Sequence, residues 1–147
     1  MRFGIKYLAV IAASTLIAPA AFADSHGGPG DADAGAKVFK KCKACHQVGE
    51  GAKNRSGPLL NDVIGRTAGT AEGFKYSKSM IAAGEAGLVW DAEKIADFIE
   101  NPSAYLKEVL DSGKAKSKMS YKAKKEADRA NVAAYLATFS DVPVPAE

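Results

Sequence analysis

The sequence has little of the residue types that several common classes of protein depend on. Only two of its 147 residues are cysteines, only two are histidines, and no hydrophobic alternation indicates a β-strand. With a single cysteine pair and no strand–helix–strand pattern, a four-cysteine zinc site and a thioredoxin-like redox domain are both disfavoured. Because 20 basic residues nearly balance 17 acidic ones, the net charge gives no support to nucleic-acid binding.

The first 23 residues have the composition of an export signal. Two basic residues precede an uncharged run of 17 residues that ends in Ala21-Phe22-Ala23, the small-residue pattern of a signal-peptidase site. The run contains Pro19 and is marginal in length for spanning a bilayer. We therefore expect residues 1–23 to be a secretory signal peptide cleaved after Ala23, rather than a retained membrane anchor.

The remaining residues, 24–147, have a length that normally forms one domain with one core. Loss of the two basic residues of the signal lowers the formal net charge from +3 to +1. An exported chain could form a disulfide, but a bridge between cysteines three positions apart closes so short a loop that it would stabilise little. The cysteine pair therefore needs another explanation.

Cys42 and Cys45 are followed at once by His46, which is the attachment pattern of a c-type haem. On a helical turn these three positions are i, i+3 and i+4 neighbours, so their side chains leave the same face. Each thiol can form a thioether to a vinyl group of the porphyrin, and the imidazole can bind the iron. The motif predicts one covalently attached haem c with His46 as an axial ligand.

The second axial position has few candidate ligands. Met119 lies in a polar segment outside any apolar helical face, so core packing does not account for it, whereas Met80 lies in a short amphipathic segment where core packing does. His26, in a glycine-rich tail, and the lysines are the other candidates. On this ground we expect Met119 to bind. A thioether is a soft, neutral ligand that stabilises the reduced iron and raises the reduction potential relative to two nitrogen ligands. Two strong axial ligands would also leave no open position for oxygen or peroxide.

Apolar periodicity and capping residues predict an all-α domain of several short helices joined by long loops. Such long loops are unusual in a small domain unless they pack on a large apolar group, and a haem is such a group. The expected helices run from Asp31 or Asp33 to Lys43, over 77–83 with Gly84 at the end, from Asp91 to about Glu100, from Asn101-Pro102 through Leu110, and from Lys122 to Phe139.

With these features, the sequence resembles the class I c-type cytochromes, and most closely the bacterial cytochrome c2 group. The resemblance implies the cytochrome c fold, in which crossing N- and C-terminal helices and long loops enclose one covalently bound haem. The matching segments follow one another through residues 31–140: Gly35 with Phe39, Cys42 to His46, Ser56-Gly57-Pro58, Ile64-Gly65-Arg66, Gly73-Phe74-Lys75-Tyr76, Gly87-Leu88-Val89-Trp90, Glu100-Asn101-Pro102, Lys118-Met119, Lys124-Lys125-Glu126 and Ala134-Tyr135-Leu136.

The resemblance also implies roles for individual residues. The carbonyl of Pro58 would accept the Nδ1 proton of His46, which leaves Nε2 for the iron. Met119 would be the sixth ligand, in agreement with the choice made from the residues alone. The side chains implied to contact a haem propionate are Arg66, Tyr76 and Trp90.

The sequence departs from mitochondrial members of the class at two positions near the expected methionine ligand. Met80 stands where those proteins have asparagine, and Phe98 stands where they have tyrosine. The segment 111–118 is also longer than the compact turn of mitochondrial forms, which is a bacterial feature. Details of redox tuning therefore cannot be carried over from the mitochondrial proteins.

Lysines are concentrated on both sides of the expected ligand segments. Both groups would border the same exposed haem edge, and such a positive face steers diffusion toward acidic docking surfaces in a salt-sensitive way. The lysines expected to take part in docking are Lys40, Lys41, Lys43, Lys116, Lys118, Lys122, Lys124 and Lys125.

The predicted function is that of a soluble, monomeric, periplasmic one-electron carrier in respiration or photosynthesis. It would be no enzyme and would bind neither nucleic acid nor a small-molecule substrate. By resemblance, a cytochrome bc1 complex would be the donor, and a terminal oxidase or a photosynthetic reaction centre would be the acceptor. The alternative is a haem enzyme or gas sensor with a labile sixth ligand, which the role of Met119 distinguishes.

Overall fold

The computed structural model describes residues 30–141, which contain five α-helices and, in place of any strand, one isolated bridge between Thr67 and Val89. The predicted all-α class is confirmed. The predicted signal peptide and its cleavage site lie outside the described residues. The helices are α1 (Ala32–Phe39), α2 (Lys78–Glu85), α3 (Ala92–Glu100), α4 (Pro102–Val109) and α5 (Glu126–Ala137).

Four of the five helices begin at a side chain that caps free backbone amides. The side chains of Asp31, Ser77, Asp91 and Asn101 each accept a hydrogen bond from the backbone N–H three residues later. Pro102 occupies the first position of α4, where its missing N–H costs nothing. The predicted helix starts at Asp91 and Asn101 are therefore correct. Each is determined by a capping side chain only three residues from the amide that it binds.

Helices α1 and α5 are shorter than the sequence predicted. α1 ends at Phe39 and is followed by turns over residues 40–45 rather than continuing to Lys43. α5 begins at Glu126 rather than Lys122, because the N–H of Ala123 donates to the carbonyl of Ile99 at 2.8 Å instead of joining a helical turn. We call the irregular segment 117–125 that precedes α5 the strap.

The predicted end of the second helix at Gly84 is wrong. α2 runs on to Glu85, and the chain turns away at Gly87, whose φ of +97° favours glycine. Gly84 serves close packing instead: a Cβ there would lie 2.0 Å from the carbonyl oxygen of Ala68. The glycine lets α2 approach the backbone of the preceding loop.

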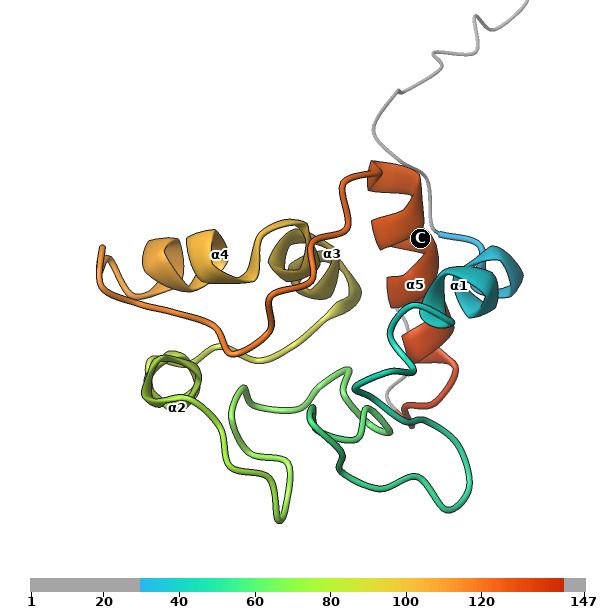
Figure 1. The fold of residues 1–147 in the computed structure, drawn as a ribbon, viewed down its shortest axis with the longest axis horizontal. Helices are drawn as coiled ribbons and strands as arrows, with labels where there is room; N and C mark the ends of the chain where they lie inside the picture. The colour runs from blue at the N-terminus through green and yellow to red at the C-terminus, as the bar shows by residue number, and fades with distance from the viewer. Residues whose placement is uncertain (1–29, 142–147) are drawn as a thin grey trace, which may run out of the picture.

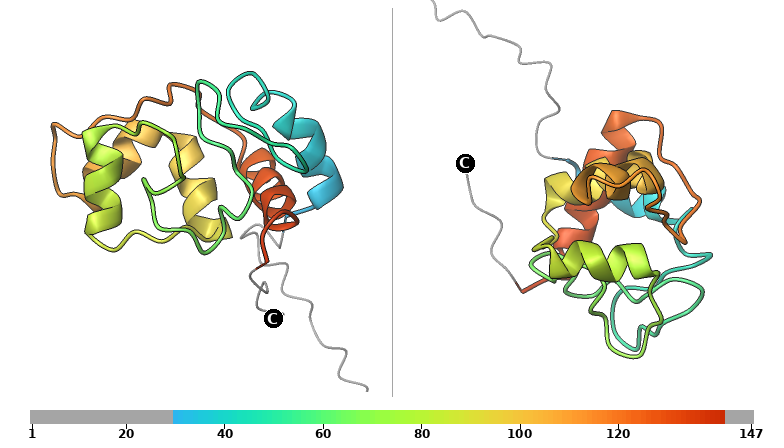
Figure 2. Two further views of the ribbon diagram at one scale, coloured as in Figure 1. Left: turned by 90° about the horizontal axis from the view of Figure 1, so that it is seen from below. Right: turned by 90° about the vertical axis from the view of Figure 1, so that its left-hand side faces the viewer.

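α1 and α5 cross in close contact at one end of the molecule (Figures 1 and 2). A Cβ on Gly35 would lie 2.0 Å from the carbonyl oxygen of Asn131, so only glycine permits this approach. The ring of Phe39 packs on that of Tyr135 with centroids 5.3 Å apart. The predicted crossing of the terminal helices is confirmed.

The other helices continue from this crossing and, together with the loops, enclose the rest of the core. α3 packs on α5 and α4, and α2 lies beneath α4, while the loop from α1 to α2 closes the lower side (Figure 1). Large apolar side chains of the core include Trp90, Phe98, Leu106 and Leu136. Within residues 30–141, no helix has the length and apolar character required to cross a membrane.

Candidate haem site

A cavity of about 300 Å³ lies among the helices, the loop after α1 and the strap. This volume is at the lower end of the roughly 300–1,000 Å³ typical of small-molecule sites. Most of its lining is apolar, and the larger apolar side chains on it come from α1, α3, α5 and the segment before α3: Phe39, Trp90, Ile95, Phe98, Val132 and Leu136.

The turn after α1 brings the three side chains of the cysteine–histidine motif to this cavity. The backbone N–H groups of Cys45 and His46 both donate to the carbonyl of Cys42, at 3.0 and 2.9 Å, so the motif forms one tight turn. Neither cysteine forms a disulfide, so both sulfur atoms can form a bond to another group. Burial raises the pKa of the Cys42 thiol to about 11, with Lys41 acting in the opposite direction, so this thiol is protonated at neutral pH.

His46 presents one ring nitrogen for a ligand. Its Nδ1 lies 2.7 Å from the carbonyl oxygen of Pro58, and since a carbonyl only accepts, Nδ1 carries the proton and Nε2 keeps its lone pair. Burial lowers the pKa of His46, against the opposing effect of the Pro58 hydrogen bond. At neutral pH the imidazole is therefore in the neutral form that binds metal ions.

Gly57 makes room for the His46 ring, a role that the sequence analysis did not assign. A Cβ on Gly57 would lie 2.4 Å from Cε1 of the imidazole, well inside contact distance. The N–H of Gly57 also donates to the carbonyl of Cys45 at 2.9 Å, which fixes the loop against the motif. The feature of the sequence that could have indicated this role is the glycine directly before Pro58, in the segment Ser56-Gly57-Pro58 that resembles the family.

Two methionines reach the cavity. Met119 lies on the strap and Met80 on α2; both are half-buried and both pack against the core. The sequence argument that Met119 lacks packing is therefore wrong, because the strap lies directly on the core. The choice of Met119 as the ligand stays a prediction. His26, another candidate named above, lies outside the described residues.

Arg66, Tyr76 and Trp90 also line the cavity and bring polar groups to its apolar wall. Arg66 donates from Nη1 to the carbonyl of Asn61 at 3.1 Å and from Nη2 to that of Leu59 at 3.2 Å, which holds the guanidinium in place. Burial lowers the pKa of Arg66 and raises that of Tyr76, while each group opposes the shift of the other. A fixed cation beside a phenol suits an anionic group at the cavity.

The family model for cytochrome c matches residues 32–140, a span that contains every residue of this site. The chain belongs to the cytochrome c family. One covalently bound haem c is typical of that family, and Cys42 and Cys45 stand in its attachment motif. The chain is accordingly an electron-transfer protein rather than an enzyme, as the sequence predicted.

Individual relatives agree with the likeness to the cytochrome c2 group. Cytochrome c-551 of Roseobacter denitrificans is 46% identical over 141 residues, covering 92% of this chain and 96% of that protein. Cytochrome c2 iso-1 of Rhodospirillum centenum is 49% identical over 118 residues, covering 76% and 98% respectively. The solved structure of cytochrome c2 from Rhodospirillum centenum aligns with a TM-score of 0.73 at 50% identity, over 76% of this chain and 99% of that one. The predicted family is confirmed.

The residues of the cavity fit a haem. Two thiols and one imidazole nitrogen with a free lone pair meet at a mostly apolar hollow, which is the donor set that covalent attachment and axial ligation require. Gly57 leaves the space that the imidazole occupies, and Arg66 supplies a positive charge on the wall of the cavity.

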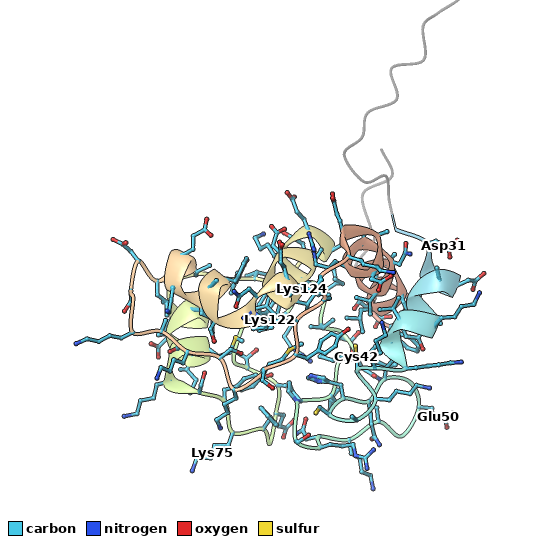
Figure 3. All side chains as sticks on the ribbon, turned by 45° about the horizontal axis from the view of Figure 1, so that its top comes forward. Asp31, Cys42, Glu50, Lys75, Lys122 and Lys124 are labelled. Atoms are coloured by element: carbon cyan, nitrogen blue, oxygen red, sulfur yellow. The ribbon has the colours of Figure 1, made fainter. Side chains whose placement is uncertain are left out.

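The eight lysines predicted for docking are all exposed, but two of them already have contacts within the chain. Lys41 lies 3.8 Å from the carboxylate of Asp128, and Lys118 donates from Nζ to the carbonyl of Lys75 at 2.6 Å. Figure 3 shows Lys122 and Lys124 on the strap, which runs past the motif that contains Cys42. The role of these lysines in docking stays a prediction.

Proposed function

We propose that this member of the cytochrome c family is a periplasmic one-electron carrier in which His46 and Met119 bind the haem iron. When bound, the haem supplies electron transfer between its ferric and ferrous states. The observation that carries the proposal is the cavity itself, which Cys42, Cys45, His46 and Met119 line together. The cysteines hold the group covalently, and His46 binds through Nε2.

Met119 is the preferred second ligand because of where its backbone lies. It belongs to the irregular strap, where the chain can adjust to the length of a metal–sulfur bond. Met80 lies in the first turn of α2, where its backbone is helical and its N–H donates a 3.1 Å hydrogen bond to the hydroxyl of the Ser77 cap. The likeness of Lys118-Met119 to the cytochrome c2 group supports the same choice.

The remaining walls of the cavity exclude water and set the polarity around the iron. Met80 and Phe98, where mitochondrial relatives have polar groups, keep their part of the wall apolar. An apolar environment disfavours the extra positive charge of ferric iron and so favours the reduced state. Arg66, Tyr76 and Trp90 donate hydrogen bonds to a propionate, and the charge of Arg66 compensates its negative charge.

The exposed lysines around the motif and the strap give the carrier a positive docking face. Such a face speeds encounters with acidic surfaces, and the effect weakens as salt is added. A cytochrome bc1 complex as donor, and a terminal oxidase or photosynthetic reaction centre as acceptor, would present suitable surfaces. The relatives named cytochrome c2 and the predicted export signal support a periplasmic location and a monomeric carrier.

The optical spectrum of the ferric holoprotein tests this assignment. The wild-type protein is expected to be low-spin, with a weak far-red band from the sulfur–iron bond, and Met119→Ala is expected to lose that band. Met80→Ala is the matched control, because it removes the other thioether of the cavity, and it is expected to keep the band. A band that survives in Met119→Ala and disappears in Met80→Ala would transfer the ligand role to Met80.

A further inference from the structure

The C-terminal end of the strap is fastened by a contact that the haem site itself does not require. Ala123 is buried, and its N–H donates to the carbonyl of Ile99 in α3 at 2.8 Å. Next to this bond, Nη1 of Arg129 donates to the carbonyls of Ala123, at 3.3 Å, and Lys124, at 3.2 Å. Three hydrogen bonds thus hold two consecutive residues of the strap against α3 and α5.

The Arg129 guanidinium is itself held in a fixed orientation. Its side chain is only 12% exposed, and Nη2 lies 3.4 Å from a carboxylate oxygen of Glu100 at the end of α3. The residue lies near the N-terminus of α5, where the helix dipole disfavours a positive charge. Its contacts with the strap on one side and with α3 on the other therefore account for its position.

The opposite end of the strap has its own fastening. The N–H of Ser117 donates to the hydroxyl of Ser103 at 3.1 Å, and the N–H of Lys116 donates to that of Ser79 at 3.1 Å. Between the two ends, the N–H of Met119 donates only to the nearby hydroxyl of Ser117. Among the described residues, the backbone groups of 120–122 form no hydrogen bond. Met119 also packs against the core, and the neighbouring Lys118 donates from Nζ to the carbonyl of Lys75, so the fastenings at the two ends act together with these contacts to place Met119.

We propose that Arg129 is a positioning residue for the sixth-ligand loop: its guanidinium clamps Ala123 and Lys124 so that Met119 stays directed into the cavity. The proposal rests on the proposed function, because it takes Met119 as the iron ligand. Arg129 does not line the cavity and acts only through the strap. Its planar fork directs Nη1 to two carbonyls and Nη2 to a carboxylate, whereas an ammonium group has all its donors on a single nitrogen.

Imidazole binding to the ferric holoprotein tests the clamp, since imidazole competes with Met119 for the iron. Arg129→Met keeps the aliphatic bulk and removes the donors, and we expect it to bind imidazole about tenfold more tightly, the size expected for loss of a charged hydrogen-bond donor. The imidazole affinity of Arg129→Lys should be closer to that of Arg129→Met than to that of the wild type. Amide exchange at Ala123 should speed up in both variants.

Asn131→Ala is the matched control. Asn131 lies on α5 as well, but its side chain accepts a hydrogen bond from the N–H of Asp31, at 2.8 Å, and forms no hydrogen bond with the described residues of the strap. This variant should lose stability while its imidazole affinity stays within about twofold of wild type. Equal imidazole affinity in Arg129→Met and wild type would overturn the proposal, and so would an equal rise in Arg129→Met and Asn131→Ala.

The two proposals fail in distinguishable ways. If the far-red band survives in Met119→Ala, the ligand assignment is wrong, whatever Arg129 does. Amide exchange at Ala123 still tests whether Arg129 holds the strap in that case, because the exchange rate depends on the strap and not on the iron. Unchanged exchange in both Arg129 variants would overturn the clamp. If Arg129→Met does not fold, Arg129→Lys decides by the same two measurements.

Discussion

At the scale of the residue, the environment of His46 is the most constrained part of the site. One neighbour, Pro58, fixes which ring nitrogen carries the proton, and the other, Gly57, provides the space for the ring. The pattern of Cys42, Cys45 and His46 could be interpreted from sequence because its members are adjacent along the chain. The space left by Gly57 could not, because it depends on how the loop folds back over the turn.

Replacing Gly57 by alanine is expected to displace the imidazole. The added Cβ would lie 2.4 Å from Cε1 and 2.8 Å from both ring nitrogens, so the ring must move and the Pro58 hydrogen bond must lengthen or break. We expect a loss of about 1–3 kcal/mol in the free energy of unfolding, the range for overpacking a core. Urea denaturation of the holoprotein measures it.

Gly113→Ala provides the control for that substitution. A Cβ on Gly113 would meet nothing within 4 Å, so the change adds the same methyl group where there is space. Its free energy of unfolding should stay within about 0.5 kcal/mol of wild type. If Gly57→Ala is as stable as Gly113→Ala, the packing of Gly57 on the histidine does not constrain the site.

At the scale of the element, sequence reasoning succeeded where the cause is local and failed where it is not. The starts of α3 and α4 follow from Asp91 and Asn101, whose side chains cap amides three residues away. The start of α5 could not be predicted, because Ala123 is held out of the helix by a bond to Ile99, a residue distant in sequence. The predicted end of α2 was wrong because Gly84 allows close packing on Ala68 and does not terminate the helix.

The cap at Asp91 makes part of the stability depend on pH. Burial raises the pKa of this carboxyl, but the hydrogen bonds and charge of Lys94 outweigh that effect and leave the pKa below its ordinary value of 3.8. A pKa that is lower in the folded state stabilises fully above the unfolded value and is lost as pH falls through the folded value. Asp91→Ala should therefore cost about 1 kcal/mol at pH 7, and the difference from wild type should shrink below about pH 4.

Urea denaturation of wild type and Asp91→Ala at pH 7 and at several values below pH 4 measures this difference. Asp97→Ala is the control, because Asp97 is exposed on the same helix and forms no ion pair among the described residues. It should change the free energy of unfolding by less than about 0.5 kcal/mol at every pH. A difference for Asp91→Ala that stays constant down to the lowest pH would contradict the role of its charge.

At the scale of the whole molecule, the fold brings together the two proposed ligand groups, which are far apart in sequence. His46 follows α1, Met119 precedes α5, and the two reach one cavity because α1 and α5 cross while the strap is fastened at both ends. The family and the all-α fold could be predicted from the order of short motifs along the chain. The fastening of the strap could not, since Arg129 belongs to none of the matching segments and its contacts with Ala123, Lys124 and Glu100 are known only from the folded chain.

Binding of carbon monoxide to the ferrous holoprotein at neutral pH tests the central claim, that two axial ligands close the iron and make the site a carrier. We expect the wild-type protein to bind no carbon monoxide at neutral pH, because Met119 occupies the sixth position. Met119→Ala, in which that position opens, is expected to bind it readily. Binding by the wild type as ready as that by Met119→Ala would contradict the claim and favour a haem enzyme or gas sensor.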